Sequence, residues 1–174
     1  SEMCIRDSLY SYQTLTDSQK RTFESFSLFP DGIDLDTFKR LIAESKKGDR
    51  NKQVGNYKKP LSDKDISVLA HKSLVEDHNG FYTLQSVIQR FSRFQFEQHT
   101  LERDRLELFR QAFLYNQSLM NYIYDLYKVN KKALLIFVSL FNNLLAALSY
   151  GAMKGIVRSD EEIEDYILMV ENIG

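Results

Sequence analysis

The chain has 174 residues, 43% of them hydrophobic, and a formal net charge of −1. This length fits one large domain or two small ones, and the apolar share suffices for a buried core, which excludes a disordered chain. The single cysteine excludes an intrachain disulfide, and we expect a reducing, cytoplasmic location.

The first eight residues read unlike the rest of the chain. Glu2-Met3-Cys4-Ile5-Arg6-Asp7-Ser8 looks like the in-frame translation of a transposon-end adapter used in preparing sequencing libraries. We therefore set residues 1–8 apart from the fold, as is done with a tag or a fusion scar. This interpretation also implies a fragment of a longer protein that continues upstream of Leu9.

Two short helices are expected next. Thr16, with Gln19 three residues later, forms a capping-box pattern that begins a helix ending before the Phe-Pro-Asp-Gly turn at residues 29–32. Asp34 or Asp36 can cap a second helix. Four apolar residues of that helix share one face at helical spacing and should enter the core: Leu35, Phe38, Leu41 and Ile42.

A basic segment follows the second helix. From Lys39 to Lys64 there are nine basic residues against three acidic ones, and Ser45 to Pro60 has two glycines and no apolar periodicity. This pattern predicts an exposed loop, whose charge is either simply solvated or a docking patch for an acidic surface. Ser62 is then expected to cap a third helix. The apolar residues of that helix are Ile66, Leu69 and Ala70.

An Asn-Gly pair predicts a hairpin after the third helix. Leu74 to Glu76 and Phe81 to Leu84 are short strand-like runs, and Asn79-Gly80 between them supplies the positive φ angles of a tight turn. Three helices, a hairpin and a closing helix predict a winged-helix module over residues 9–99. The closing helix is expected to bury a continuous apolar stripe of Val87, Ile88, Phe91 and Phe94.

Beyond residue 99 the pattern is entirely helical and predicts an antiparallel helical array over residues 100–174, so the chain as a whole is expected to be mainly α. Ala133 to Met153 carries no charged residue, which raises a transmembrane interpretation. Unpaired Asn142 and Asn143 at its midpoint would be costly in hydrocarbon, so we favour a buried helix whose asparagines bond to neighbours. The apolar residues before this segment form two stripes: Leu101, Leu108, Phe109, Ala112 and Phe113, then Leu119, Ile123, Leu126 and Tyr127.

The final helix is predicted to begin at Ser159, because Ser159 and Glu162 form a second capping-box pattern. Asn142 to Tyr150 is similar to the first helix of a tetratricopeptide-like unit, and Glu161 to Ile173 to its second helix. The array is expected to be truncated, since the chain ends before a third unit.

Three segments together resemble a known family. In their order and spacing they are similar to the winged-helix domain of NB-ARC and related STAND signalling ATPases, over roughly Leu15 to Gln98. In that family an ATPase core precedes the winged helix and a repeat-built sensor array follows it. The resemblance implies an upstream nucleotide-binding domain as partner, ATP or ADP in the intact protein, and protein partners for the helical array. The segments are Phe26-Ser27-Leu28-Phe29-Pro30-Asp31-Gly32, Leu69-Ala70-His71-Lys72-Ser73-Leu74-Val75, and Gly80-Phe81-Tyr82-Thr83-Leu84-Gln85 followed by Val87 and Phe91.

The resemblance also implies one candidate cofactor-binding residue, Gln85. The family has a Met-His-Asp motif whose histidine senses the nucleotide phosphate, and the matching positions here are Leu84, Gln85 and Ser86. Gln85 cannot become cationic and Ser86 lacks the carboxylate. Gln85 either donates an amide hydrogen to a phosphate or is a plain surface glutamine, and we favour the second interpretation.

No catalytic or metal site is expected in the chain itself. It has no Gly-rich loop ending in Lys-Ser or Lys-Thr, so it should not hydrolyse ATP. His71, His78 and His99 share no metal-ligand spacing. The alternative function is a DNA-binding regulator, but Ser62 to Lys72 lacks the arginine or asparagine that reads bases. We predict a non-catalytic regulatory and protein-interaction fragment that binds neither nucleic acid nor membrane.

Overall fold

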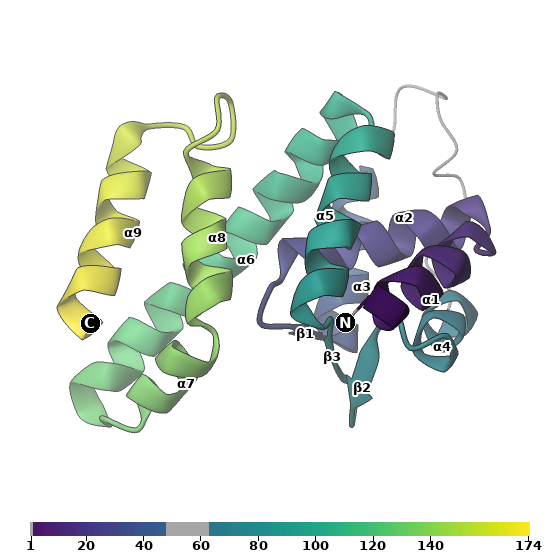
Figure 1. Cartoon of the computed structure of the whole chain (residues 1–174). Helices are drawn as coiled ribbons and strands as arrows, with labels where there is room; N and C mark the ends of the chain where they lie inside the picture. The colour runs from purple at the N-terminus through teal and green to yellow at the C-terminus, as the bar shows by residue number, and fades with distance from the viewer. Residues whose placement is uncertain (1, 48–62) are drawn as a thin grey trace.

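The computed structural model describes residues 2–47 and 63–174. Within these ranges the chain forms nine α-helices, one short 3-10 helix and a three-stranded antiparallel sheet (Figure 1). Two helical groups lie side by side in Figure 1, with the sheet under the first group and the long helix α6 running between them. The expectation of a mainly α fold with a small hairpin is confirmed.

The first group has the element order expected of a winged helix. Its sheet has the strand order β1-β3-β2, with both neighbouring pairs antiparallel, so β2 and β3 form the predicted hairpin. After this element order, we call the first group the winged-helix body, or winged helix, and the hairpin β2–β3 the wing. The strand β1 was missed in the sequence because it is only two residues long. The elements are α1 (Glu2–Gln13), α2 (Asp17–Ser25), the 3-10 helix η1 (Phe26–Leu28), β1 (Ile33–Asp34), α3 (Leu35–Lys47), α4 (Asp63–His71), β2 (Glu76–His78), β3 (Phe81–Thr83) and α5 (Ser86–His99).

Two predicted helix starts of this group, those of α2 and α3, are confirmed. The Thr16 side chain accepts a hydrogen bond from the backbone N of Gln19 at 3.2 Å, and the Gln19 side chain accepts one from the backbone N of Thr16 at 3.0 Å. This is the reciprocal capping box. Of the two candidate caps for α3, Asp34 is the one used, because its carboxylate accepts from the backbone N of Thr37 at 2.9 Å.

The boundaries around the basic segment and the wing differ from the prediction. Helix α3 continues to Lys47, so residues 45–47 are helical, as lysine is a good helix former. The rest of the predicted loop and the Ser62 cap lie outside the described residues. The hairpin turn has only two residues, Asn79 at φ 56° and Gly80 at φ 89°. Asp77 and His78 therefore belong to strand β2, which begins at Glu76, and Asp77 pairs with Tyr82.

The predicted apolar stripe of α5 is wrong in part. Val87 and Phe94 are 49% and 57% exposed, and the buried side of the helix carries Ile88, Ser92 and Phe96. Ser92 is small and its hydroxyl donates to the backbone O of Phe23 at 2.9 Å. Because Ser92 is small, α5 can lie close against α2 at this position. In this orientation of α5, Val87 and Phe94 of the predicted stripe face solvent.

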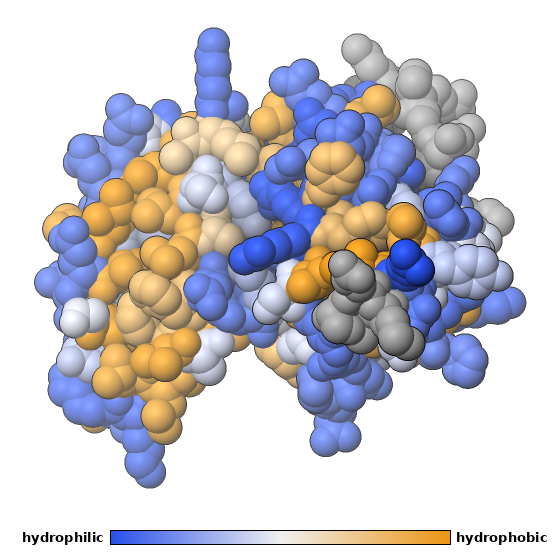
Figure 2. All heavy atoms as spheres, viewed as in Figure 1, coloured by the Kyte–Doolittle hydropathy of each residue, from blue (hydrophilic) through white to orange (hydrophobic). Residues whose placement is uncertain are grey.

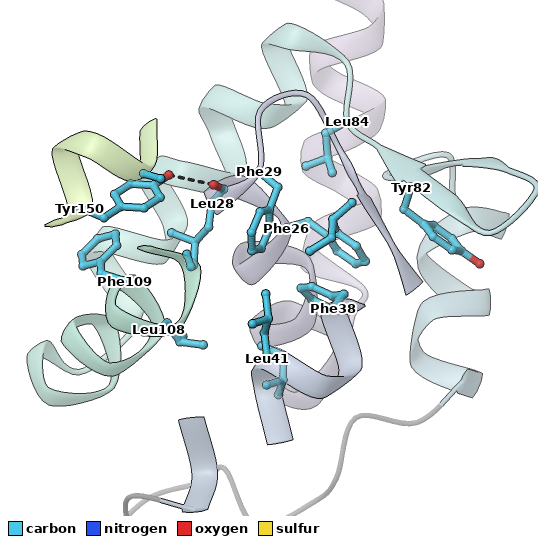
Figure 3. Packing of buried hydrophobic residues seen from close by; sticks show 14 of the residues in the cluster. Phe26, Leu28, Phe29, Phe38, Leu41, Tyr82, Leu84, Leu108, Phe109 and Tyr150 are labelled. Atoms are coloured by element: carbon cyan, nitrogen blue, oxygen red, sulfur yellow. Dashed lines mark hydrogen bonds between the residues drawn. The ribbon is translucent and has the colours of Figure 1, made fainter. Parts of the chain in front are cut away.

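The second group begins with a single long helix. Both predicted stripes lie on α6 (Glu102–Val129), which packs against α3 of the winged helix and against α7 (Ala133–Ser139), α8 (Phe141–Gly151) and α9 (Asp160–Ile173). Leu101 precedes α6 and is 55% exposed, contrary to its place in the predicted stripe. The two groups share one core, which in Figure 3 runs from stacked Phe26 and Phe38 through Leu41 to Leu108.

The uncharged segment is not one helix. It breaks at Leu140, and α7 and α8 are bent by 67° relative to each other. No single helix of the described residues has the length and apolar character to cross a membrane. Helices α7 and α8 taken together are long and apolar enough, by length and composition only.

The second predicted capping box is wrong. Ser159 stands at the N-cap of α9, but its side chain makes no capping hydrogen bond. The Glu162 carboxylate accepts from the backbone N of Arg158 at 3.0 Å. A capping box would require a bond to the backbone N of Ser159, so the carboxylate bonds one residue earlier than predicted.

Candidate functional site

Gln85, the residue proposed from the family resemblance, lies on the surface where the wing meets α5. It is the N-cap residue of α5, but its side chain makes no capping hydrogen bond. Its Nε2 donates to Oε1 of Glu76 on β2 at 2.9 Å. Leu84 is buried at 8% exposure, and Ser86 is exposed. The amide of Gln85 is therefore used within the chain, and a role in nucleotide sensing stays a prediction.

A hollow of about 240 Å³ lies beside Gln85, between α1 and α5. Its walls are mainly apolar, and two of its lining residues, Ile5 and Ser8, belong to the segment that looks like adapter translation. The other lining residues are Leu9, Gln85, Val87, Ile88 and Phe91. Because Ile5 and Ser8 form part of its wall, we assign no ligand to the hollow.

The most elaborate polar contact in the chain joins the turn at residues 29–32 to helix α8. The Asn143 side chain is 3% exposed, and both ends of its amide are used. Its Oδ1 accepts from the backbone N of Asp31 at 2.7 Å, and its Nδ2 donates to the backbone O of Gly32 at 2.8 Å. The Asn143 amide thus bonds both a backbone donor and a backbone acceptor of the turn, as a neighbouring strand does in a sheet.

Asp31 returns the contact by capping α8. Its carboxylate accepts from the backbone N of Asn142 at 2.6 Å and of Asn143 at 3.2 Å, and also from Nδ2 of Asn142 at 3.0 Å. The N-cap residue of α8, Leu140, offers no side-chain cap of its own. A carboxylate at a helix N-terminus satisfies free N–H groups and interacts favourably with the helix dipole. The winged helix thus supplies the cap that α8 lacks.

A third contact lies two turns along α8, at Tyr150. Its hydroxyl donates to the backbone O of Leu28 at 2.9 Å (Figure 3), and its ring stacks on Phe109 at 5.0 Å. The Arg93 guanidinium of α5 lies 4.9 Å from the Phe109 ring and 5.3 Å from the Tyr150 ring. Burial raises the pKa of Tyr150, although Arg93 opposes the rise. We call the contacts of residues 28–32 with Asn142, Asn143 and Tyr150 the junction.

Gly32 holds the junction against the sheet. Its φ is +95°, in the left-handed region that favours glycine. A Cβ here would lie 2.6 Å from the ring of Phe81 and 2.7 Å from both the Thr83 methyl and the backbone O of Tyr82. The turn therefore lies against β3 on one side and bonds to α8 on the other.

A second buried polar contact joins α1 to α2. Glu24 is fully buried, and its carboxylate accepts from the Tyr12 hydroxyl at 2.7 Å and pairs with Arg21. Burial raises the pKa of Glu24, against the opposing effects of Tyr12 and Arg21. Burial, and then the bond to Glu24, also raise the pKa of Tyr12. We call this set the α1 contact, and it holds α1 on the winged-helix body.

The histidines do not come together. His71, His78 and His99 are all exposed, on α4, on β2 and at the end of α5. Among the described residues, no group of three or more histidine, cysteine, aspartate or glutamate side chains could hold a metal ion.

Only the α8 side of the junction could be predicted from the sequence. Two asparagines in an uncharged, apolar segment predicted buried hydrogen-bond partners, and Asn143 has them. The partner turn lies 111 or 112 residues earlier, and no spacing rule connects the two. Arg93 of α5 lies against Phe109 and Tyr150, a contact that no local pattern in the sequence indicates.

Comparisons with known proteins add no relative: no family model, curated protein or solved structure matches the chain. The function must therefore be argued from the residues and their contacts.

Proposed function

We propose that this chain is a non-catalytic regulatory and protein-interaction part of a STAND-type signalling ATPase. Its helical array, residues 100–174, binds a partner and is coupled through the winged helix to a nucleotide-binding core upstream of Leu9. The family resemblance suggests the ATPase, and the junction supports the coupling.

The observation that carries the proposal is the reciprocal bonding between Asp31 and Asn143. Each side satisfies backbone groups of the other, so moving the array off the first group would exchange these hydrogen bonds for bonds to water. Switching by a partner would require a second, undocked arrangement in which these bonds are broken, in addition to the docked one described here. The turn also adjoins the wing, which lies next to Gln85.

The first test is the gene upstream of Leu9. A phosphate-binding loop in the uninterrupted reading frame supports the proposal, and a complete frame without one removes its main support. In the full-length protein, Asn143→Ala should change the rate of ADP release, whereas Asn142→Ala, which removes a single exposed side-chain donor, should change it far less. Equal release rates in both variants and the wild type would contradict coupling through the junction.

The second candidate is a winged-helix DNA-binding regulator, in which α4 would enter the major groove. Two of its acidic residues bond within the chain: Asp63 pairs with Lys39, and Asp65 accepts from Ser18 at 2.9 Å. Gel retardation of duplex DNA by residues 9–174 separates the two candidates. A regulator would retard DNA, with affinity falling steeply as salt rises, and we expect no retardation at modest salt.

A further inference from the structure

Helices α7, α8 and α9 leave large apolar side chains in solvent. Leu135 and Val138 on α7 are 71% and 65% exposed, Leu145 on α8 is 42% exposed and Leu168 on α9 is 54% exposed. In Figure 2 hydrophobic side chains gather over these three helices on the face turned to the viewer, and hydrophilic ones border the outer edge of α9. We call these four residues, with the acidic residues of α9, the array face.

Helix α9 is strongly acidic. It has six acidic residues and no lysine or arginine in 14 positions. Glu161, Glu164, Leu168 and Glu171 follow one another at intervals of three or four residues, so they lie on one side of the helix. That side is exposed and lies opposite buried Tyr166 and Ile173. Leu168 is therefore an apolar residue set among carboxylates.

Within residues 2–47 and 63–174, these carboxylates have no cationic partner. In the described residues no ion pair reaches Glu161, Glu164, Asp165 or Glu171. Other acidic residues do have cations on their own helices: Arg93 pairs with Glu97 and Lys128 with Asp125. Like charges three or four residues apart destabilise a helix. A cationic partner on α9 would remove this repulsion while covering the exposed leucines.

We propose that the array face binds a cationic amphipathic helix of a partner protein. Its apolar side would cover Leu145 and Leu168, and its lysines or arginines would face Glu161, Glu164 and Glu171. Helix-in-groove recognition uses this combination of apolar anchors and complementary charge. A second copy of the chain would set acidic α9 against the same acidic surface, and an anionic lipid surface would repel it. The inference names the partner of the array and so rests on the proposed function.

The test uses the purified chain and two labelled peptides of about five helical turns. One has a leucine face and lysines elsewhere, and the other has the same leucine face with glutamates. Fluorescence anisotropy should show binding of the lysine peptide, weakening as salt rises, and no binding of the glutamate peptide. Leu168→Ser should weaken binding about tenfold, the expected effect of losing one buried leucine contact. The triple variant E161Q, E164Q, E171Q should weaken binding and lose most of its salt dependence.

The matched controls are on α6, away from the array face. Leu114 is 43% exposed and Glu102 is exposed, so Leu114→Ser and Glu102→Gln should leave the affinity unchanged. Circular dichroism confirms that each variant is folded. Equal binding of both peptides, or no loss in Leu168→Ser, would overturn the proposal. So would dimerisation of the chain alone that Leu168→Ser abolishes, or binding to zwitterionic vesicles. Failure here leaves the ADP-release test of the junction intact, because that test needs no peptide.

Discussion

Helices α8 and α1 both dock on the winged-helix body, but with different chemistry. At the junction, α8 uses a neutral amide, Asn143, bonded to two backbone groups of the turn. At the α1 contact, a phenol and a buried carboxylate, Tyr12 and Glu24, hold the helix. The amide has no charge to lose between pH 4 and 10. The carboxylate has a raised pKa because burial disfavours its charged form.

Because of this difference, the two attachments should respond differently to pH. The bonds of the Asn143 amide to backbone specify one geometry and respond little to pH. A buried acid gives an attachment whose strength depends on protonation. We expect the array to stay docked over a wide range of pH, and α1 to be the attachment that pH changes.

The largest effect should come from the turn. Gly32→Ala puts a side chain at φ +95° and against Phe81, Thr83 and the backbone of Tyr82, so unfolding free energy should fall by about 3–5 kcal/mol. Gly80→Ala is the matched control: its φ is +89°, but a Cβ there meets nothing within 4 Å. The control should lose only about 1 kcal/mol. Urea denaturation of both variants measures the difference, and equal losses would show that the turn does not lie against β3.

The amide of the junction should rank second. Asn143→Ala leaves the backbone N of Asp31 and the backbone O of Gly32 without partners, which should lower unfolding free energy by about 2–3 kcal/mol. Asn142→Ala keeps its backbone bond to Asp31 and should lose less than about 1 kcal/mol. Similar urea midpoints for the two variants would mean that Asn143 does not hold the turn.

The α1 contact should rank third. Tyr12→Phe leaves the buried Glu24 carboxylate with one bond fewer, and should lower unfolding free energy by about 1–2 kcal/mol. Tyr10 is 70% exposed on the same helix, so Tyr10→Phe should change nothing measurable. Thermal unfolding of both variants checks this ranking. A loss in Tyr12→Phe larger than in Asn143→Ala would reverse the comparison between the two attachments.

The smallest effect is a dependence on pH. Because the folded pKa of Glu24 lies above its ordinary 4.5, the folded chain binds a proton there more tightly than the unfolded chain does. Stability from this group should therefore fall as pH rises from 4.5 through the folded pKa, by about 1.4 kcal/mol for each unit of pKa shift. Glu24→Gln removes the titrating group. Parallel stability curves for wild type and variant over this range would exclude Glu24 as the source.

Much of the first group was predictable because its signals are local. The Thr16–Gln19 box, the Asp34 cap and the Asn79-Gly80 turn each depend on neighbouring residues, and each forms as predicted. The second box failed at Ser159 because Glu162 could also bond to the backbone of Arg158. A local pattern predicts well only where no second acceptor or donor competes.

The junction was not predictable because its partners are far apart in the chain. The need of Asn143 for a buried partner could be inferred, but not that the partner is the turn at Asp31. The outward rotation of Val87 and Phe94 likewise depends on Ser92 meeting Phe23, a contact between two helices. Contacts of this kind arise from packing, which propensity and periodicity do not describe.

Helix α6 is unbroken over 28 residues, a rod of about 42 Å that spans both halves of the molecule. One end packs on α3 and the remainder carries α7, α8 and α9. Because this one rod contacts α3 as well as α7, α8 and α9, those three helices cannot shift far relative to the first group without repacking along α6.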